Sequence, residues 1–241
     1  SDILSGGAGD DILVGDSYDK LSGGAGTDTA ILTDDSDINL DIGRLSIERF
    51  YAGGGDDKIK GGQKNEFISG GRGNDRVEGG AGDDTYRFNR GDGQDIIADY
   101  FGTTKVISRW QWVTYSTSDG EGGVETDRVR ERFSEIIDTS ANGGEDELSF
   151  GDGIKPEDLS LQFVDGALQI TVQGIGSEAD ENSSNSADII KIINWGDALD
   201  RIEKFSFEDG TELDVANLTG KILEASEDGM TLVASSGNDW L

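Results

Sequence analysis

In the first hundred residues or so, an apolar position recurs at intervals of nine, which is neither the spacing of a helix nor the alternation of a long strand. Residues 6–14, 70–78 and 79–87 fit the pattern Gly-Gly-x-Gly-x-Asp-x-apolar-x, and imperfect copies surround them. The glycine-rich half has access to positive φ and predicts a tight turn, while the half after the aspartate predicts a very short strand. The apolar eighth position of each unit is expected to point inward: Leu4, Leu13, Leu21, Ile59, Ile68, Val77 and Tyr86. Repetition at a fixed period predicts a solenoid in which two units complete one coil.

This periodicity divides the chain into six segments. Repeats fill residues 1–30 and 52–99, and residues 31–51 interrupt them, either as decayed coils of the same solenoid or as a hairpin looped out of it. An insertion is expected at residues 100–143, a β-rich or α+β domain at residues 144–220, and a linker leading into a further repeat at residues 221–241. Because the sequence starts and stops inside repeat units, we expect it to be a piece of a larger tandem protein.

The segments after the repeats follow other patterns. Residues 105–115 are rich in strand formers, with Trp110 and Trp112 on one side, whereas residues 126–138 show apolar positions at a helical spacing and predict a short helix. An Asp-Gly pair between two alternating runs, 159–163 and 168–172, predicts a hairpin. Two further strands are expected over the ranges 188–195 and 201–207.

Charge and composition exclude several function classes. Fifty acidic residues against 20 basic ones leave a net charge of −30, so the clustered cations that nucleic acids and anionic membranes require are missing. No run approaches the length of a transmembrane helix, and direct membrane insertion is not expected. The absence of Cys and His excludes disulfides, thiolate nucleophiles and Ser-His-Asp triads. So acidic a composition is also typical of disorder, but the regular spacing of the acids argues against it.

The acids at the sixth position of each unit are the candidate ligands. Because two units make a coil, acids two units apart lie on the same edge, and the expected pairs are Asp2 with Asp19, Asp11 with Asp28, Asp57 with Asp75, Glu66 with Asp84 and Asp75 with Asp95. Carboxylates together with backbone carbonyls are hard oxygen ligands of the kind that Ca²⁺ prefers, which predicts about four or five Ca²⁺ ions between coils. The glycines expected to contribute those carbonyls are Gly7, Gly9, Gly24, Gly26, Gly53, Gly55, Gly71, Gly73, Gly80 and Gly82.

These repeats resemble the repeats-in-toxin (RTX) family of calcium-binding parallel β-rolls. Residues 88–99 and 144–219 are similar to the haemolysin-type capping module that follows such repeats, whereas residues 101–143 have no counterpart there. The resemblance implies a mostly β fold, secretion by type I machinery of a Gram-negative bacterium, and folding outside the cell when calcium is met.

The expected function is therefore a non-enzymatic, calcium-binding module of a large secreted or surface protein, an adhesin or a toxin. Two alternatives stay open. In the first, the insertion carries a glycan- or protein-binding site that uses Trp110 and Trp112. In the second, the chain is the non-catalytic C-terminal region of a secreted lipase, protease or pore-forming toxin.

Overall fold

The computed structural model describes residues 1–99, 104–118, 124–138, 144–151, 153–173, 187–195, 201–215 and 217; for 104–118 and 124–138 it describes the backbone alone. The chain forms two compact units. One comprises Ser1–Phe101 together with Asn142–Leu241, and the other is Gly102–Ala141. None of the helices in the described part of the chain has the length and apolar composition needed to cross a bilayer.

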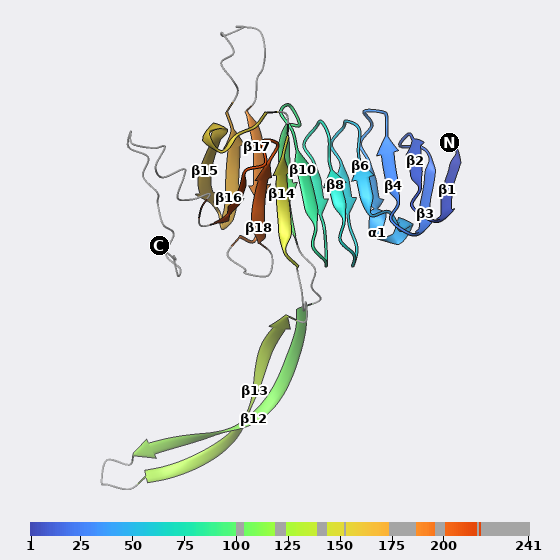
Figure 1. Ribbon diagram of the computed structural model, residues 1–241. Coiled ribbons are helices and arrows are strands. Elements are labelled where there is room, and N and C mark those ends of the chain that lie inside the picture. Colours follow the sequence, from blue (N-terminus) through green and yellow to red (C-terminus); the bar gives the residue numbers. More distant parts are fainter. Residues whose placement is uncertain are drawn as a thin grey trace. The chain divides into compact units, whose positions relative to one another are not determined.

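The larger unit is a parallel β-roll (Figure 1). Its eight-stranded sheet has the order β19-β18-β14-β10-β8-β6-β4-β2, its seven-stranded sheet the order β15-β16-β17-β11-β9-β7-β5, and β1 pairs with β3. The strands of the repeats are β1 (Ile3–Ala8), β2 (Ile12–Gly15), β3 (Lys20–Ala25), β4 (Thr29–Leu32), β5 (Asn39–Asp41), β6 (Arg49–Tyr51), β7 (Lys58–Lys60), β8 (Phe67–Ser69), β9 (Arg76–Glu78), β10 (Thr85–Phe88) and β11 (Gln94–Ile97). From β4 to β11, successive strands alternate between the two larger sheets, so each of these coils contributes one strand to each sheet.

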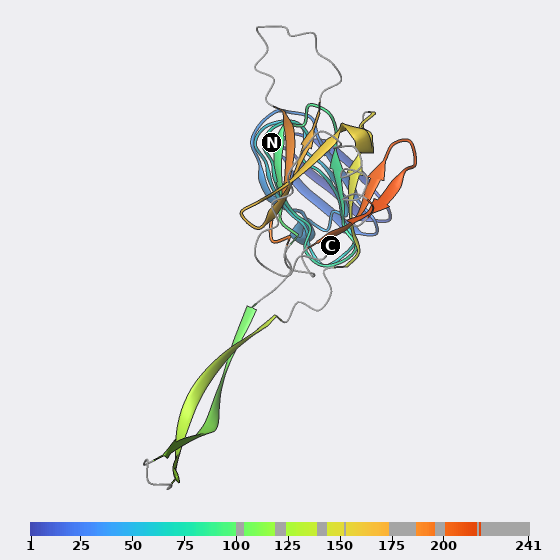
Figure 2. The same cartoon turned by 90° about the vertical axis from the view of Figure 1, so that its left-hand side faces the viewer.

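The core of the roll is a column of side chains from the eighth repeat position. Leu13, Leu21, Ile59 and Ile68 are buried, as the sequence predicts, and Leu4 is half-buried in the first coil. Viewed along the roll, the coils superpose (Figure 2). Each coil buries too little apolar surface to be stable alone, so stability depends on stacking.

Residues 31–51 continue the roll as decayed coils and do not loop out. Strand β6 pairs in parallel with both β4 and β8, and β5 pairs in parallel with β7. A one-turn helix, α1 (Ile42–Leu45), replaces a glycine-rich turn here, and Ser46 adopts a left-handed conformation at its end. Ile42 is fully buried, so the interior column is unbroken through the interruption.

The far end of the roll is finished by antiparallel strands. Strands β14 (Asp146–Phe150) and β18 (Ile202–Phe207) extend one sheet in parallel, and β17 (Asp188–Ile192) extends the other. A 3-10 turn (Pro156–Asp158) leads into β15 (Leu159–Val164) and β16 (Ala167–Val172), and β19 (Glu212–Asp214) pairs antiparallel with β18. The predicted hairpin is confirmed, with Asp165 and Gly166 both at positive φ in its two-residue turn.

The smaller unit is a long antiparallel hairpin. Strand β12 (Thr104–Ser118) pairs with β13 (Val124–Asp138) along its whole length, from Thr104 opposite Asp138 to Ser118 opposite Val124. The helix predicted over residues 126–138 is therefore wrong. Val129, Phe133 and Ile137 are four residues apart, which suits one face of a helix and equally one face of a strand, and the partner strand decides between them. The linker and further repeat expected at residues 221–241 lie outside the described residues.

Candidate metal centres

Two rows of acidic side chains follow the edges of the roll. The first ladder lies at the start of strands of the eight-stranded sheet, and the second ladder lies at the start of β1, β3, β7, β9 and β11. The first ladder contains Asp11, Asp28, Glu48, Glu66, Asp84, Asp146 and Glu203. The second ladder contains Asp2, Asp19, Asp57, Asp75 and Asp95, with Ile38 at the same position in the coil before Asp57.

Most consecutive ladder residues are joined by a repeated hydrogen bond. The backbone N–H of one acid donates to a carboxylate oxygen of the acid in the next coil. All five predicted pairs show it, at donor–acceptor distances of 2.5 Å for Asp2 to Asp19, 3.0 Å for Asp11 to Asp28, 2.9 Å for Asp57 to Asp75, 2.8 Å for Glu66 to Asp84 and 3.0 Å for Asp75 to Asp95. The structure thus places the members of each pair side by side.

The second oxygen of most ladder carboxylates is buried and has no hydrogen-bond partner. Such an oxygen is found in Asp11, Asp28, Asp57, Glu66, Asp75, Asp84, Asp99 and Asp146. A buried anionic oxygen without a partner is costly, and native proteins satisfy such groups with donors or cations. Carboxylate oxygens repeated from coil to coil fit Ca²⁺, which takes six to eight oxygen ligands.

Glycine at the first repeat position lets these carboxylates approach the backbone. A Cβ on Gly6 would lie 2.7 Å from Asp11 Oδ2, and one on Gly23 would lie 2.6 Å from Asp28 Oδ2. The glycines predicted at the second and fourth positions all have positive φ except Gly53, whose carbonyl accepts the Arg72 N–H at 3.2 Å. The turn therefore requires glycine at the first position for close approach of the carboxylate, and at the second and fourth positions for the positive φ.

Burial makes the charged form of these groups unfavourable. It raises the pKa of Asp57 to about 7 and that of Asp75 to about 6, although a backbone N–H donated to each carboxylate acts in the opposite direction. Burial also raises the pKa of Asp84 and of Asp95 to about 8, and neighbouring carboxylates add to both shifts. A divalent cation between the coils would reverse this balance, because it favours the carboxylate form.

Comparison with protein families identifies the repeats. The RTX calcium-binding nonapeptide repeat (4 copies) matches residues 1–17, 43–63 and 61–97. The haemolysin-type calcium binding protein related domain matches residues 168–217. The chain belongs to the RTX calcium-binding repeat proteins. No curated protein matches its sequence. The ladders are thus the edges of an RTX roll, whose repeats bind calcium.

We call two ladder residues in consecutive coils a rung. The rungs that contain Asp19 and Glu48 differ from the rest. Asp19 uses both carboxylate oxygens for backbone N–H groups, those of Asp2 and Asp16, and these hydrogen bonds lower its pKa. Glu48 accepts the Asp28 N–H at 2.8 Å on one oxygen and the Lys64 ammonium on the other. Lys64 stands where the repeat has its fourth-position glycine, so at this rung a side-chain cation neutralises the ladder.

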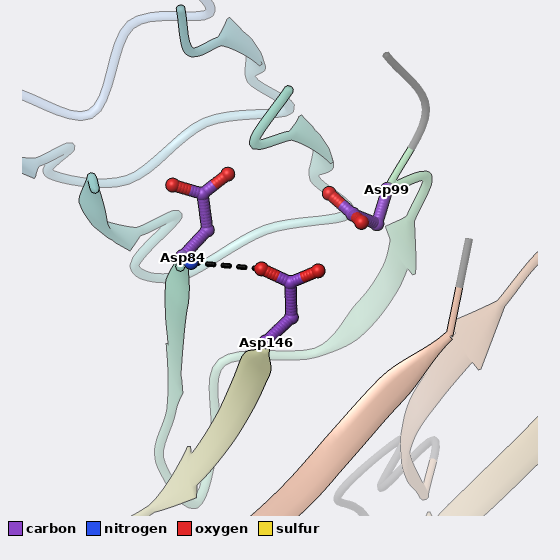
Figure 3. Close-up of side chains that lie close together, drawn as sticks. All are labelled: Asp84, Asp99 and Asp146. Carbon is purple, nitrogen blue, oxygen red and sulfur yellow. Dashed lines mark hydrogen bonds between the residues drawn. The ribbon is translucent and has the colours of Figure 1, made fainter. Parts of the chain in front are cut away.

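Sequence reasoning missed four acids of the site: Glu48, Asp99, Asp146 and Glu203. Asp146 follows Gly144 at the spacing that joins Gly82 to Asp84, which was the available signal, but the insertion separates it from its ladder neighbour. Burial, followed by the proximity of the Asp99 carboxylate, raises the pKa of Asp146 to about 10. Asp84, Asp99 and Asp146 bring ligand atoms within 4.8 Å of one another (Figure 3).

Proposed function

We propose that this chain is a calcium-driven folding module of a larger secreted or surface-attached bacterial protein, an adhesin or a toxin, and that it performs no catalysis itself. The proposal rests on the buried oxygens of the ladder carboxylates that have no hydrogen-bond partner. Such an oxygen is present on both members of the predicted pairs Asp11–Asp28, Asp57–Asp75 and Glu66–Asp84. In the pair Asp75–Asp95 only Asp75 has one. The absence of His and Cys supports a non-catalytic role.

The energetics favour a fold that depends on calcium. A site with free Ca²⁺ at ten to a hundred times its dissociation constant adds about 1.4–2.7 kcal/mol. Four such sites would then supply roughly 5–11 kcal/mol, which is comparable with the whole stability of an ordinary domain. Without the ion, the same carboxylates repel one another and lack solvation, so the roll is disfavoured.

This dependence suits export. Dissociation constants of extracellular calcium modules are about 0.1–1 mM, so the low calcium of the cytosol would leave the chain unfolded and able to pass the type I secretion machinery. Calcium outside the cell would then fill the rungs and drive folding. The net charge of −30 delays collapse before the ion is met.

Circular dichroism of the full chain tests this proposal. The β-sheet signal should appear on addition of millimolar CaCl₂ and disappear with excess chelator. Mg²⁺ at the same concentration should substitute poorly, because it requires strict octahedral geometry and holds its waters. A β signal unchanged by the chelator would overturn the proposal.

A second candidate function rests on the hairpin unit, which is compact and distinct from the roll. In this reading Gly102–Ala141 binds a glycan or a protein, with Trp110 and Trp112 two positions apart on β12 as the contact residues. Binding on a glycan array that is lost in the Trp110→Ala/Trp112→Ala variant, with the calcium response of the roll intact, would favour it. The absence of any glycan or protein binding by the wild-type chain would contradict this second candidate function.

A further inference from the structure

The insertion interrupts a calcium loop of the roll and not a connection between domains. Ala98 donates its N–H to the Val77 carbonyl, so Asp99 lies beside Gly79, the first position of the preceding loop. On the other side of the insertion, the Asp84 N–H donates to Asp146 Oδ1 at 2.8 Å, so Asp146 holds the sixth position. Residues 100–143 therefore take the place of the second and third positions of this loop.

The split loop carries an extra carboxylate. At the first position four of the other first-ladder loops have glycine, namely Gly6, Gly23, Gly61 and Gly79, and the α1 loop has Ile42. Asp99 stands there instead, and its side chain reaches the space between Asp84 and Asp146 (Figure 3). The ordinary rung of two carboxylates thus becomes a group of three.

Each of the three carboxylates is held by one oxygen and has the other free. Asp84 accepts the Glu66 N–H at 2.8 Å, Asp99 accepts the Tyr86 hydroxyl at 2.8 Å, and Asp146 accepts the Asp84 N–H. The second oxygen of each has no hydrogen-bond partner, and each residue exposes only 1% of its surface. Among the described residues no Lys or Arg forms an ion pair with any of them.

We infer that Asp84, Asp99 and Asp146 form a calcium site of their own, which joins the chain before the insertion to the chain after it. The inference rests on the calcium-dependent folding proposed above but adds a site outside the four regular rungs. Three fixed carboxylates give this site more negative charge than a two-carboxylate rung, and ligand charge and rigidity set calcium affinity. It is therefore the tightest site of the roll.

A second consequence concerns the insertion. Asp99 immediately precedes residues 100–143, and Asp146 follows them by three residues. An ion bound to both fixes the two ends of the inserted segment to the same loop. Calcium then anchors the point at which the chain leaves the roll and returns to it.

Calcium titration of the full chain against a chromophoric chelator tests the site. The Asp99→Asn variant keeps an acceptor for the Tyr86 hydroxyl and loses only the charge. We expect its tightest binding step to weaken by about tenfold or more, with the remaining steps unchanged. The matched control is Asp83→Asn, at the exposed acid next to Asp84, because asparagine keeps the oxygen that accepts the Glu145 N–H. Its titration should superpose on that of the wild type.

The outcomes separate the two hypotheses. A wild-type chain that binds no calcium overturns the proposed function, whereas calcium binding that is identical in wild type and Asp99→Asn overturns this site alone. If Asp99→Asn fails to fold, Asp99→Gly restores the glycine that four of the other loops have at this position. That variant should fold with calcium and show the same loss of the tightest step, and an unaltered step in it would equally overturn the site.

Discussion

The backbone N–H of Asp57 donates a hydrogen bond of 2.9 Å to Asp75 Oδ1 in the next coil. Asp75 forms the same hydrogen bond with the following coil, because its own N–H donates to Asp95 Oδ1 at 3.0 Å. Asp75 therefore belongs to two rungs of the second ladder, while its remaining oxygen is buried without a partner. Asp11, near the first coil, has a ladder neighbour on one side among the described residues.

This difference predicts unequal effects of removing one charge. Asp75→Asn should abolish calcium binding at two rungs, and Asp11→Asn at one, because each rung needs both carboxylates. Calorimetric stoichiometry at pH 7.5 measures the loss directly. Asp56→Asn, at the exposed neighbouring position, should leave the stoichiometry unchanged. Equal losses in Asp75→Asn and Asp11→Asn would show that ions do not bridge consecutive coils.

The raised pKa values predict an inverted pH dependence without calcium. Asp57, Asp75, Asp84 and Asp95 have folded-state pKa values of about 6 to 8, well above those of unfolded aspartate, so the folded chain binds more protons. The free energy of unfolding should then rise as pH falls from 8 towards 4. With saturating calcium the trend should reverse over the same range, because protons compete with the ion.

Circular dichroism in calcium-stripped buffer and urea unfolding in saturating calcium, each at pH 5 and pH 8, measure this dependence. Without calcium the β-sheet signal should be larger at pH 5, and with calcium the urea midpoint should be higher at pH 8. A calcium-free chain that is more stable at pH 8 would mean that the ladder carboxylates are solvated and ionised in the folded state.

Lys64 predicts a rung that is independent of calcium. Its ammonium pairs with the buried carboxylate of Glu48, although 56% of the lysine side chain is exposed. Lys64→Gln should lower the free energy of unfolding in saturating calcium by about 1 kcal/mol, as expected for a partly exposed ion pair. Lys64→Gly restores the repeat and frees one oxygen of Glu48 beside Glu66, so it should bind one more Ca²⁺ than the wild type. Native mass spectrometry counts the ions, and an unchanged count in Lys64→Gly would contradict this role.

First-position glycines predict a defect specific to the calcium response. A Cβ on Gly79 would collide with Asp84 Oδ2 and the Tyr86 hydroxyl, so Gly79→Ala should displace the carboxylate at a cost of about 1–3 kcal/mol and weaken the stabilisation by calcium. Gly166, at φ +78 with open space around it, is the control. Gly166→Ala should cost about 1–2 kcal/mol from backbone strain and leave the calcium-induced shift in melting temperature unaltered.

The regular part of the fold and site could be predicted from local spacing. Glu66 and Asp84 are separated by two units, and Val77 between them occupies the buried eighth position, so both facts follow from counting. Asp146 could not be found this way, because it lies 62 residues after Asp84, whose N–H its carboxylate accepts. Glu48 was missed because a helical turn replaced the glycines that mark a loop.

The hairpin shows a different limit of sequence reasoning. Apolar residues spaced by four in 126–138 satisfy a helix and a strand alike, and local propensity does not choose between them. The long pairing with β12 is a non-local interaction, so only the partner strand could have identified the segment as β13.

The split loop also shows that the roll can accept an inserted segment within one of its loops. Its second and third positions can be replaced by a segment whose two ends lie close together, as Thr104 and Asp138 do, while the fourth and sixth positions keep their register with the preceding coil. Gly24–Ala25 and Gly80–Ala81 occupy the same positions in intact loops. A hairpin grafted there would be displayed from a scaffold that assembles when calcium arrives, and one solenoid could carry several such grafts along a single edge.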